Sequence, residues 1–189
     1  MRALYKTLGA FTMLCISAQA FCASSVQSNP CEDSKPRVTA YGSLTMSVCS
    51  NGKGVMSDTL KLDGRAIISD IQLFREDFSS DWSKIVYTSA TQDKKTGCPA
   101  HLFIVDISTK PVTVIGFGVK NGCNQFHWAS WGKRRSVIAL DTNVEFKYEN
   151  GKLTPPKADE YLDANMRPTM FDLSKEKLQP FIEYISPAK

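Results

Sequence analysis

The chain has 189 residues, of which 42% are hydrophobic, and a formal net charge of +4 at pH 7. This length is typical of one domain and is sufficient for a hydrophobic core. The charges are well mixed, and the densest basic run is the triplet Lys133-Arg134-Arg135, which we expect in a solvated turn. Nucleic acid is therefore a poor candidate partner, because domains that bind it gather Lys and Arg on one face.

The N-terminus has the features of an export signal. Arg2 and Lys6 precede an apolar run over residues 8–18, and small residues follow at Ala18, Ala20 and Ala23. The run is too short for a bilayer span, which needs about 20 residues. We therefore predict a signal peptide over residues 1–23, cleaved between residues 20 and 24, and a periplasmic protein that does not insert into the membrane. The alternative is a buried N-terminal helix.

Beyond the signal, the chain alternates between short apolar runs and turns. Residues 24–36 are polar and contain proline, which predicts an N-terminal tether to a single β domain over residues 37–189. A short helix is expected between the prolines of residues 155–168. Alternating or continuous apolar residues predict strands at 37–49, 66–74, 84–90, 101–107, 112–119, 125–131, 136–141 and 144–149.

The strands at 101–107 and 112–119 form the clearest hairpin. Their apolar runs are nearly continuous, which predicts a sheet covered on both faces. With Thr109 and Lys110 at the centre of the turn, Cys98 lies opposite residue 121. Cys123 is then a diagonal neighbour of Cys98 on the same face, within reach of a bond after a small bulge or twist.

Four cysteines remain after cleavage behind Ala23: Cys31, Cys49, Cys98 and Cys123. An even number in an oxidising compartment favours two disulfides. Three pairings are possible in principle, and chain order favours Cys31–Cys49 and Cys98–Cys123, because each pair brackets one local β segment.

Two cysteines are also spaced for metal binding. Cys98 is followed by His101, and Cys123 by His127, which is the composition of a Cys₂His₂ zinc site. Zinc requires both histidines to turn to one point, whereas the hairpin and the oxidising compartment favour the disulfide. We therefore expect no metal, and two histidines at strand ends.

An internal repeat suggests how the sheets are built. Residues 105–115 and 171–181 align without gaps, and residues 78–89 parallel residues 128–140 with a one-residue slip. This pattern is typical of propeller blades, which are four-stranded antiparallel sheets. We expect a mainly β fold of two blade-like antiparallel sheets, at about 66–119 and 125–185, in an open propeller-like arc or a sandwich with one or two short helices. Convergent turn chemistry in any β-meander is the alternative.

No catalytic motif is present. The chain lacks G-x-S-x-G, H-E-x-x-H, a P-loop and C-x-x-C, and two histidines leave little room for a His-based acid–base site. We predict that the protein is not an enzyme and has no cofactor. Trp82, Trp128 and Trp131 cluster around the two repeat turns, where they suit packing between blades or, if exposed, contact with a partner.

The stretch FSSDWSKIVYTS…HLFIVDISTKPVTVI resembles the repeat of TolB-like periplasmic propellers. Trp82 stands where that repeat usually has glycine. Small size, a signal peptide and disulfides make the chain similar to periplasmic immunity proteins that protect bacteria against type VI-secreted peptidoglycan amidases, over roughly residues 74–120.

This resemblance implies a protein inhibitor. In that family a loop between the second and third blade strands enters the amidase cleft, where a hydroxyl meets the catalytic Cys and His. The matching loop here is 88–100, and a second candidate face is 120–131. The residues expected to contact a cognate secreted cell-wall hydrolase are Ser89, Thr91, Gln92, Asp93, Lys94, Lys95, Thr96, Asn124, His127, Trp128 and Trp131.

Two other interpretations remain open. Loop 88–100 has the composition of a plain exposed connection that is tied down at Cys98. The whole chain is also compatible with a periplasmic propeller-type scaffold or ligand-binding module without enzymatic activity. A gene for a small Cys/His hydrolase next to this one would favour the inhibitor.

Overall fold

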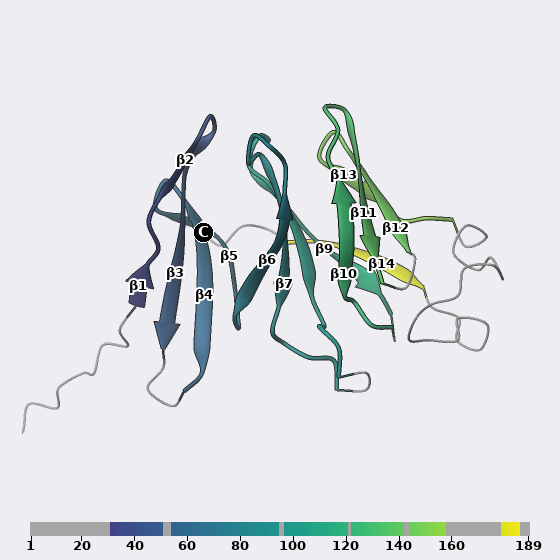
Figure 1. The fold of residues 1–189 in the computed structure, drawn as a ribbon, viewed down its shortest axis with the longest axis horizontal. Coiled ribbons are helices and arrows are strands. Elements are labelled where there is room, and N and C mark those ends of the chain that lie inside the picture. Colours follow the sequence, from purple (N-terminus) through teal and green to yellow (C-terminus); the bar gives the residue numbers. More distant parts are fainter. Residues whose placement is uncertain are drawn as a thin grey trace, which may run out of the picture.

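The computed structural model describes residues 31–50, 54–94, 97–120, 122–141, 144–157 and 179–185. This part of the chain is mainly β and contains no helix, so the predicted class is confirmed and the predicted short helices are not seen. Most of the segment predicted as helical, residues 158–168, lies outside the described residues, as does the signal peptide. Three antiparallel sheets lie side by side as successive layers (Figure 1), where two were expected.

The first sheet comes from a region where the sequence predicted a tether, a strand at 37–49 and the start of the strand at 66–74. Its order is β1-β3-β4-β5, with β2 also paired to β3. Residues 31–33 of the predicted tether form its edge, and Cys31 is the direct register partner of Cys49. The strands are β1 (Cys31–Asp33), β2 (Arg37–Thr39), β3 (Gly42–Ser50), β4 (Met56–Leu62) and β5 (Arg65–Asp70).

The middle sheet begins where the predicted strand 66–74 breaks. β5 ends at Asp70, and Gln72 takes a positive φ of 42° that turns the chain into the next sheet. The order of the middle sheet is β14-β9-β8-β7-β6. Its strands are β6 (Leu73–Phe78), β7 (Lys84–Ser89), β8 (Leu102–Asp106), β9 (Thr113–Val119) and β14 (Pro180–Tyr184).

The third sheet is a meander of order β10-β11-β12-β13. The predicted turn at Asn150-Gly151 is confirmed: both residues have positive φ, and they join β12 to β13. One part of the predicted second unit, 125–185, is wrong: β14 falls within these residues but pairs with β9 of the middle sheet and not with a strand of the third sheet. The strands are β10 (Phe126–Ser130), β11 (Arg135–Leu140), β12 (Glu145–Glu149) and β13 (Lys152–Thr154).

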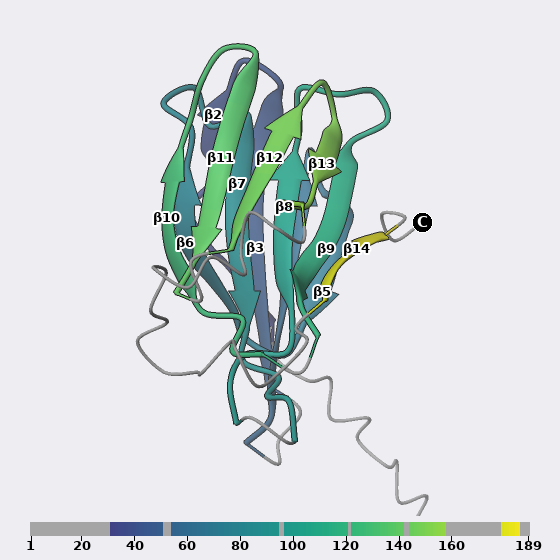
Figure 2. The same cartoon turned by 90° about the vertical axis from the view of Figure 1, so that its right-hand side faces the viewer.

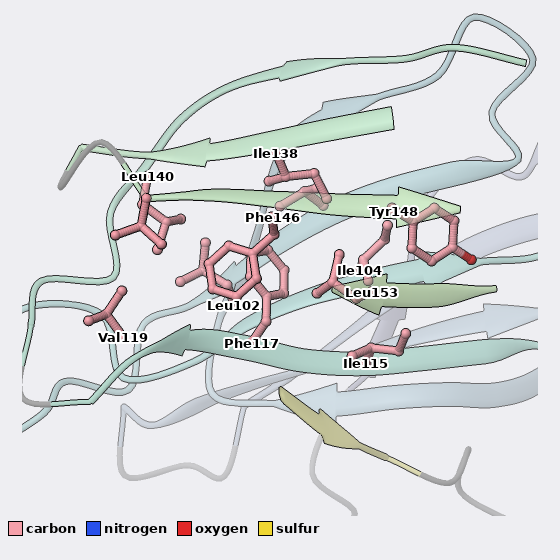
Figure 3. Close-up of a cluster of buried hydrophobic side chains, with 12 residues drawn as sticks. Leu102, Ile104, Ile115, Phe117, Val119, Ile138, Leu140, Phe146, Tyr148 and Leu153 are labelled. Atoms are coloured by element: carbon pink, nitrogen blue, oxygen red, sulfur yellow. The ribbon is translucent and has the colours of Figure 1, made fainter. Parts of the chain in front are cut away.

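The middle sheet is covered on both faces, as its continuous apolar runs predict. All five residues of β8 are buried, and they alternate between two cores. Phe103 and Val105 pack against the first sheet, whereas Leu102 and Ile104 pack against the third. Figure 3 shows the second of these cores, in which the rings of Phe117 and Phe146 meet edge to face with 5.1 Å between their centroids.

One buried polar contact joins the middle and third sheets. The Tyr148 hydroxyl points out of the apolar cluster (Figure 3) and donates a hydrogen bond of 2.6 Å to Asp106 Oδ2. Asp106 ends β8, is 2% exposed, and accepts two further bonds from Ser108. Burial, with the bond to Asp106, raises the pKa of Tyr148 above its usual range.

The turn between β6 and β7 is organised by Asp81 and Trp82. Trp82 has a φ of 60°, in the left-handed region that favours glycine, which explains why the resembling repeat has glycine there. Its ring stacks on Phe78 with 3.8 Å between centroids, and the Arg37 guanidinium of the first sheet lies 3.8 Å from its centroid. These contacts compensate for the backbone strain and tie two sheets together.

We expect Asp81 to make the protein sensitive to acid. Burial by itself raises the pKa of Asp81, but hydrogen bonds from Ser79 and Ser83 outweigh it and hold the pKa at about 2. Because this folded-state pKa lies below the unfolded value, the contribution of Asp81 to stability is present above about pH 4 and is lost as the pH falls towards 2. The contribution should be at most about 1 kcal/mol, since the carboxylate is exposed.

The measurement is urea unfolding of the wild type and Asp81→Asn at pH 6, 4 and 2. The variant should be less stable at pH 6, and the difference should close by pH 2. Glu76→Gln, on the neighbouring exposed strand, is the control and should keep the acid dependence of the wild type. A difference that is constant with pH would contradict the assignment.

Candidate functional site

The Cys98–Cys123 disulfide fixes one end of the middle sheet. The register from Leu102↔Phe117 to Asp106↔Thr113 is the predicted one, and it brings the two cysteines to a Cα–Cα distance of 5.1 Å. The second bridge, Cys31–Cys49, joins β1 to β3. Both predicted pairings are confirmed. Two disulfides indicate an oxidising environment, which an exported protein reaches.

The histidines of the apparent zinc pattern have other partners. His101 Nδ1 lies 3.2 Å from Asp70 Oδ2, and His127 Nδ1 lies 3.0 Å from Asp141 Oδ1. Within the described residues no group of three or more His, Cys, Asp or Glu side chains is arranged to hold a metal ion. Both cysteines of the pattern are in the disulfide, so they are not available as thiolate ligands.

The loop between β7 and β8 is itself ordered by its backbone. Gln92 forms a bridge with Pro99, the Asp93 N–H donates to the Cys98 carbonyl at 2.8 Å, and the Ala100 N–H donates to the Thr91 carbonyl at 2.8 Å. The loop is therefore a small hairpin, and the disulfide ties its second arm at Cys98 to Cys123, beyond the end of β9. We call residues 90–94 and 97–100 the bridged loop.

The predicted contact residues of this loop have different surroundings. Ser89 is fully buried at the end of β7, where its hydroxyl bonds to the Ile71 carbonyl and accepts from the Thr91 N–H. The Thr91 hydroxyl bonds to Asp70 at 3.2 Å. Gln92 and Lys94 are exposed, and Asp93 is half-buried. Lys95 and Thr96 lie outside the described residues.

The second predicted face is also divided. Asn124 is 4% exposed and accepts a hydrogen bond of 2.6 Å from the Val119 N–H, so it supports the end of β9. Trp131 packs against the core between the middle and third sheets, and its Nε1 has no partner among the described residues. His127 and Trp128 are exposed on β10. A partner could therefore reach His127 and Trp128 but not Asn124.

A pocket of about 440 Å³ lies beside the bridged loop. It opens between β6 and β10, the edge strands of the middle and third sheets, which lie side by side (Figure 2). Phe74 and Glu76 of β6, Gln92 and Pro99 of the loop, and Gln125 and Phe126 at the start of β10 line it, along with Thr88, Ser89 and Ala90. The disulfide holds two of its walls together.

The pocket has an unsatisfied polar group. Thr88 Oγ1 is buried and has no hydrogen-bond partner among the described residues. A buried hydroxyl without a partner costs about 1 to 3 kcal/mol, so such groups call for an explanation.

One residue in the lining of this pocket is a strongly exposed aromatic: Phe74 is 52% exposed. Ile71, at 44%, is outside the lining, and its carbonyl accepts hydrogen bonds from the Ala90 N–H and the Ser89 hydroxyl. Trp128 is 38% exposed, two residues beyond Phe126 on β10. Aromatic residues at the edge of a pocket are typical anchors of protein interfaces. Sequence reasoning found Trp128 and included Thr88 at the start of the candidate loop 88–100 without naming it as a contact, but it missed Phe74, which it placed in a strand with no surface assigned.

Neither family models nor characterised proteins nor solved structures gave a match to this chain. Among the residues that the structure describes, no helix has the length and apolar character to cross a membrane. The bridged loop and the pocket beside it form the candidate functional site.

Proposed function

We propose that this protein is a periplasmic inhibitor that binds a peptidoglycan-degrading toxin and protects the cell that makes it. The observation that carries the proposal is the bridged loop, which is tied down through Cys98–Cys123 and lies beside a pocket with the exposed aromatic Phe74 on its rim. The two disulfides indicate an oxidising environment, and together with the predicted export signal they support a location in the compartment where cell-wall hydrolases act.

The rigidity of the loop supports binding rather than a plain connection. An inhibitor that inserts a loop into a cleft loses affinity if that loop must first be ordered. Here the hydrogen bonds of Asp93 and Ala100 and the disulfide fix the loop before any partner arrives. The exposed Gln92 and Lys94 project from this fixed base and are the loop contacts that we propose.

The hydroxyl expected to meet the toxin's catalytic residues is not Ser89 in this conformation, because Ser89 is buried. The Thr91 hydroxyl is bonded to Asp70, so it too is engaged within the protein. We propose that Gln92, Lys94 and the rim residue Phe74 provide the main contacts, with Trp128 at the edge. Ser89 and Asn124 then act by positioning the loop and the end of β9.

The test uses a small Cys/His hydrolase encoded in the same genome, with binding measured by calorimetry. Phe74→Ala should weaken binding about 30-fold, which corresponds to the roughly 2 kcal/mol of an interface hot spot. The fold should be unaffected, since Phe74 is 52% exposed. Melting temperature is measured on the same samples.

Tyr184→Ala is the matched control. Tyr184 is also aromatic and exposed, but it lies on β14, the opposite edge strand of the same sheet. Its replacement should leave affinity unchanged. Equal losses for the two variants would show that the pocket rim is not the site. Absence of binding to any cell-wall hydrolase of that genome would remove the inhibitor proposal and favour a scaffold or ligand-binding module.

A further inference from the structure

The face of the middle sheet that is turned toward the first sheet has a hollow in it. Tyr87 and Phe103 are neighbours on this face, and both pack in the core between the two sheets. The β9 residue paired with Phe103 is Gly116, which is paired in turn with Glu183 of β14. A row of large side chains is therefore interrupted by a residue that has none.

A pocket of about 490 Å³ occupies this position, lined by residues of β5 in the first sheet and of β8, β9 and β14 in the middle sheet. Ile67, Ile68, Phe103 and Phe181 give it apolar walls. A Cβ atom on Gly116 would come within 3.2 Å of Ile185 Cδ1, so a side chain there would take up part of the space. The volume is in the range of small-molecule sites.

Two carboxylates, Asp70 and Glu183, line the pocket together with the His101 ring and the Ser69 hydroxyl. Asp70 is held on one side: its Oδ2 lies 3.2 Å from His101 Nδ1, and its Oδ1 accepts from the Ile71 N–H at 2.7 Å and from the Thr91 hydroxyl at 3.2 Å. Glu183 lies on the other side, on β14, and is exposed. Among the described lining residues there is neither lysine nor arginine.

We propose that this pocket binds a small amphipathic cation, with an aromatic or branched aliphatic body and a primary ammonium or guanidinium group. The body fits between Ile67, Ile68 and the two phenylalanine rings, where burial of apolar surface drives binding. The cation lies toward Glu183, with Asp70 adding negative potential and Phe181 a ring face. This site lies on the other face of the middle sheet from the proposed toxin contact and does not depend on it.

The experiment titrates the oxidised protein, freed of residues 1–23, with three probes of one shape and different charge: 2-phenylethylamine, 2-phenylethanol and phenylacetate. Binding is followed by NMR shifts and by calorimetry. The amine should bind with a Kd of about 1 mM or tighter, the alcohol about tenfold more weakly, and the carboxylate not measurably. Equal affinity for amine and carboxylate would overturn the proposal.

Substitutions test whether Glu183 is the negative charge that binds the ammonium group of the amine. Glu183→Gln should weaken amine binding about fivefold to tenfold and leave alcohol binding unchanged, because only the ionic contact is removed. Glu149→Gln, an exposed glutamate on β12 of the third sheet, is the control and should change neither. Gly116→Ala should weaken both ligands by narrowing the pocket. If Glu183→Gln and Glu149→Gln behave alike, the cation does not bind here.

Discussion

Replacing both Cys98 and Cys123 by serine is expected to lower affinity for the toxin about 100-fold and the free energy of unfolding by about 3 kcal/mol. The stability loss follows from the chain entropy that the bridge removes from the unfolded state. The affinity loss has a separate cause: the bridged loop loses its anchor at Cys98, and ordering two or three loop residues on binding costs about 3 kcal/mol.

The Cys31/Cys49 pair provides the control that separates the two effects. That bridge closes a loop of similar length in the first sheet, away from the toxin contact. Its double serine variant should lose about the same stability, but its affinity should stay within about twofold of the wild type. Urea unfolding and calorimetry on both variants make the comparison. Equal affinity losses would mean that the loop is not pre-organised by its own bridge.

Tyr148→Phe is expected to destabilise the protein by about 2 to 3 kcal/mol, the largest effect that we expect from removal of one oxygen atom. The Asp106 carboxylate would stay buried and lose its contact with the third sheet, keeping only the bonds from Ser108. The two sheets would then meet with a buried charge that is poorly compensated. The measurement is the free energy of unfolding from urea titration at pH 7.

A double-mutant cycle assigns this loss to the pair. With Asp106→Asn as background, Tyr148→Phe should cost clearly less, since an amide is easier to bury than a carboxylate. Tyr41→Phe, on the exposed end of the first sheet, is the control and should cost less than 0.5 kcal/mol. A loss of the same size in both backgrounds would show that the Tyr148 effect has another origin.

The middle sheet was the part of the fold most open to prediction. Its strands have the longest apolar runs, and the hairpin turn at Thr109 and Lys110 fixed the register that brings Cys98 and Cys123 together. Local patterns of this kind depend on neighbours in the chain, so they can be found in the sequence. The two-sided burial of β8 followed for the same reason.

The first sheet was only partly predicted, from the strands at 37–49 and 66–74, because the signals of its other strands are weak. β4 has an isolated Met56 and then Leu60 and Leu62 among polar residues, so its alternation is short. The run over residues 66–74 looked like one strand because nothing in its composition shows the change of direction at Gln72. The pairing of β14 with β9 is long-range, and no local pattern specifies which sheet a strand joins.

The candidate site was only partly predictable. Gln92 and Lys94 were assigned from their place in a polar loop, and they are exposed. Ser89 and Asn124 are polar in the sequence but buried in the fold, because each satisfies backbone groups at the end of a strand. Phe74 has the opposite character: it is an apolar residue in a strand that stays exposed because β6 is an edge.

The pairing of β14 with β9 has a consequence for how the chain assembles. The strands of the third sheet are consecutive in the chain, so they can pair as soon as they are synthesised. β9 precedes the third sheet in the chain and β14 follows it, so β9 can pair with β14 only after the whole third sheet has been synthesised. Until then β9 is paired only with β8, its other edge is open, and the core that its apolar residues line is incomplete. We expect the joining of β14 to be the slow step of folding, and β9 to be the segment most in need of a chaperone before it.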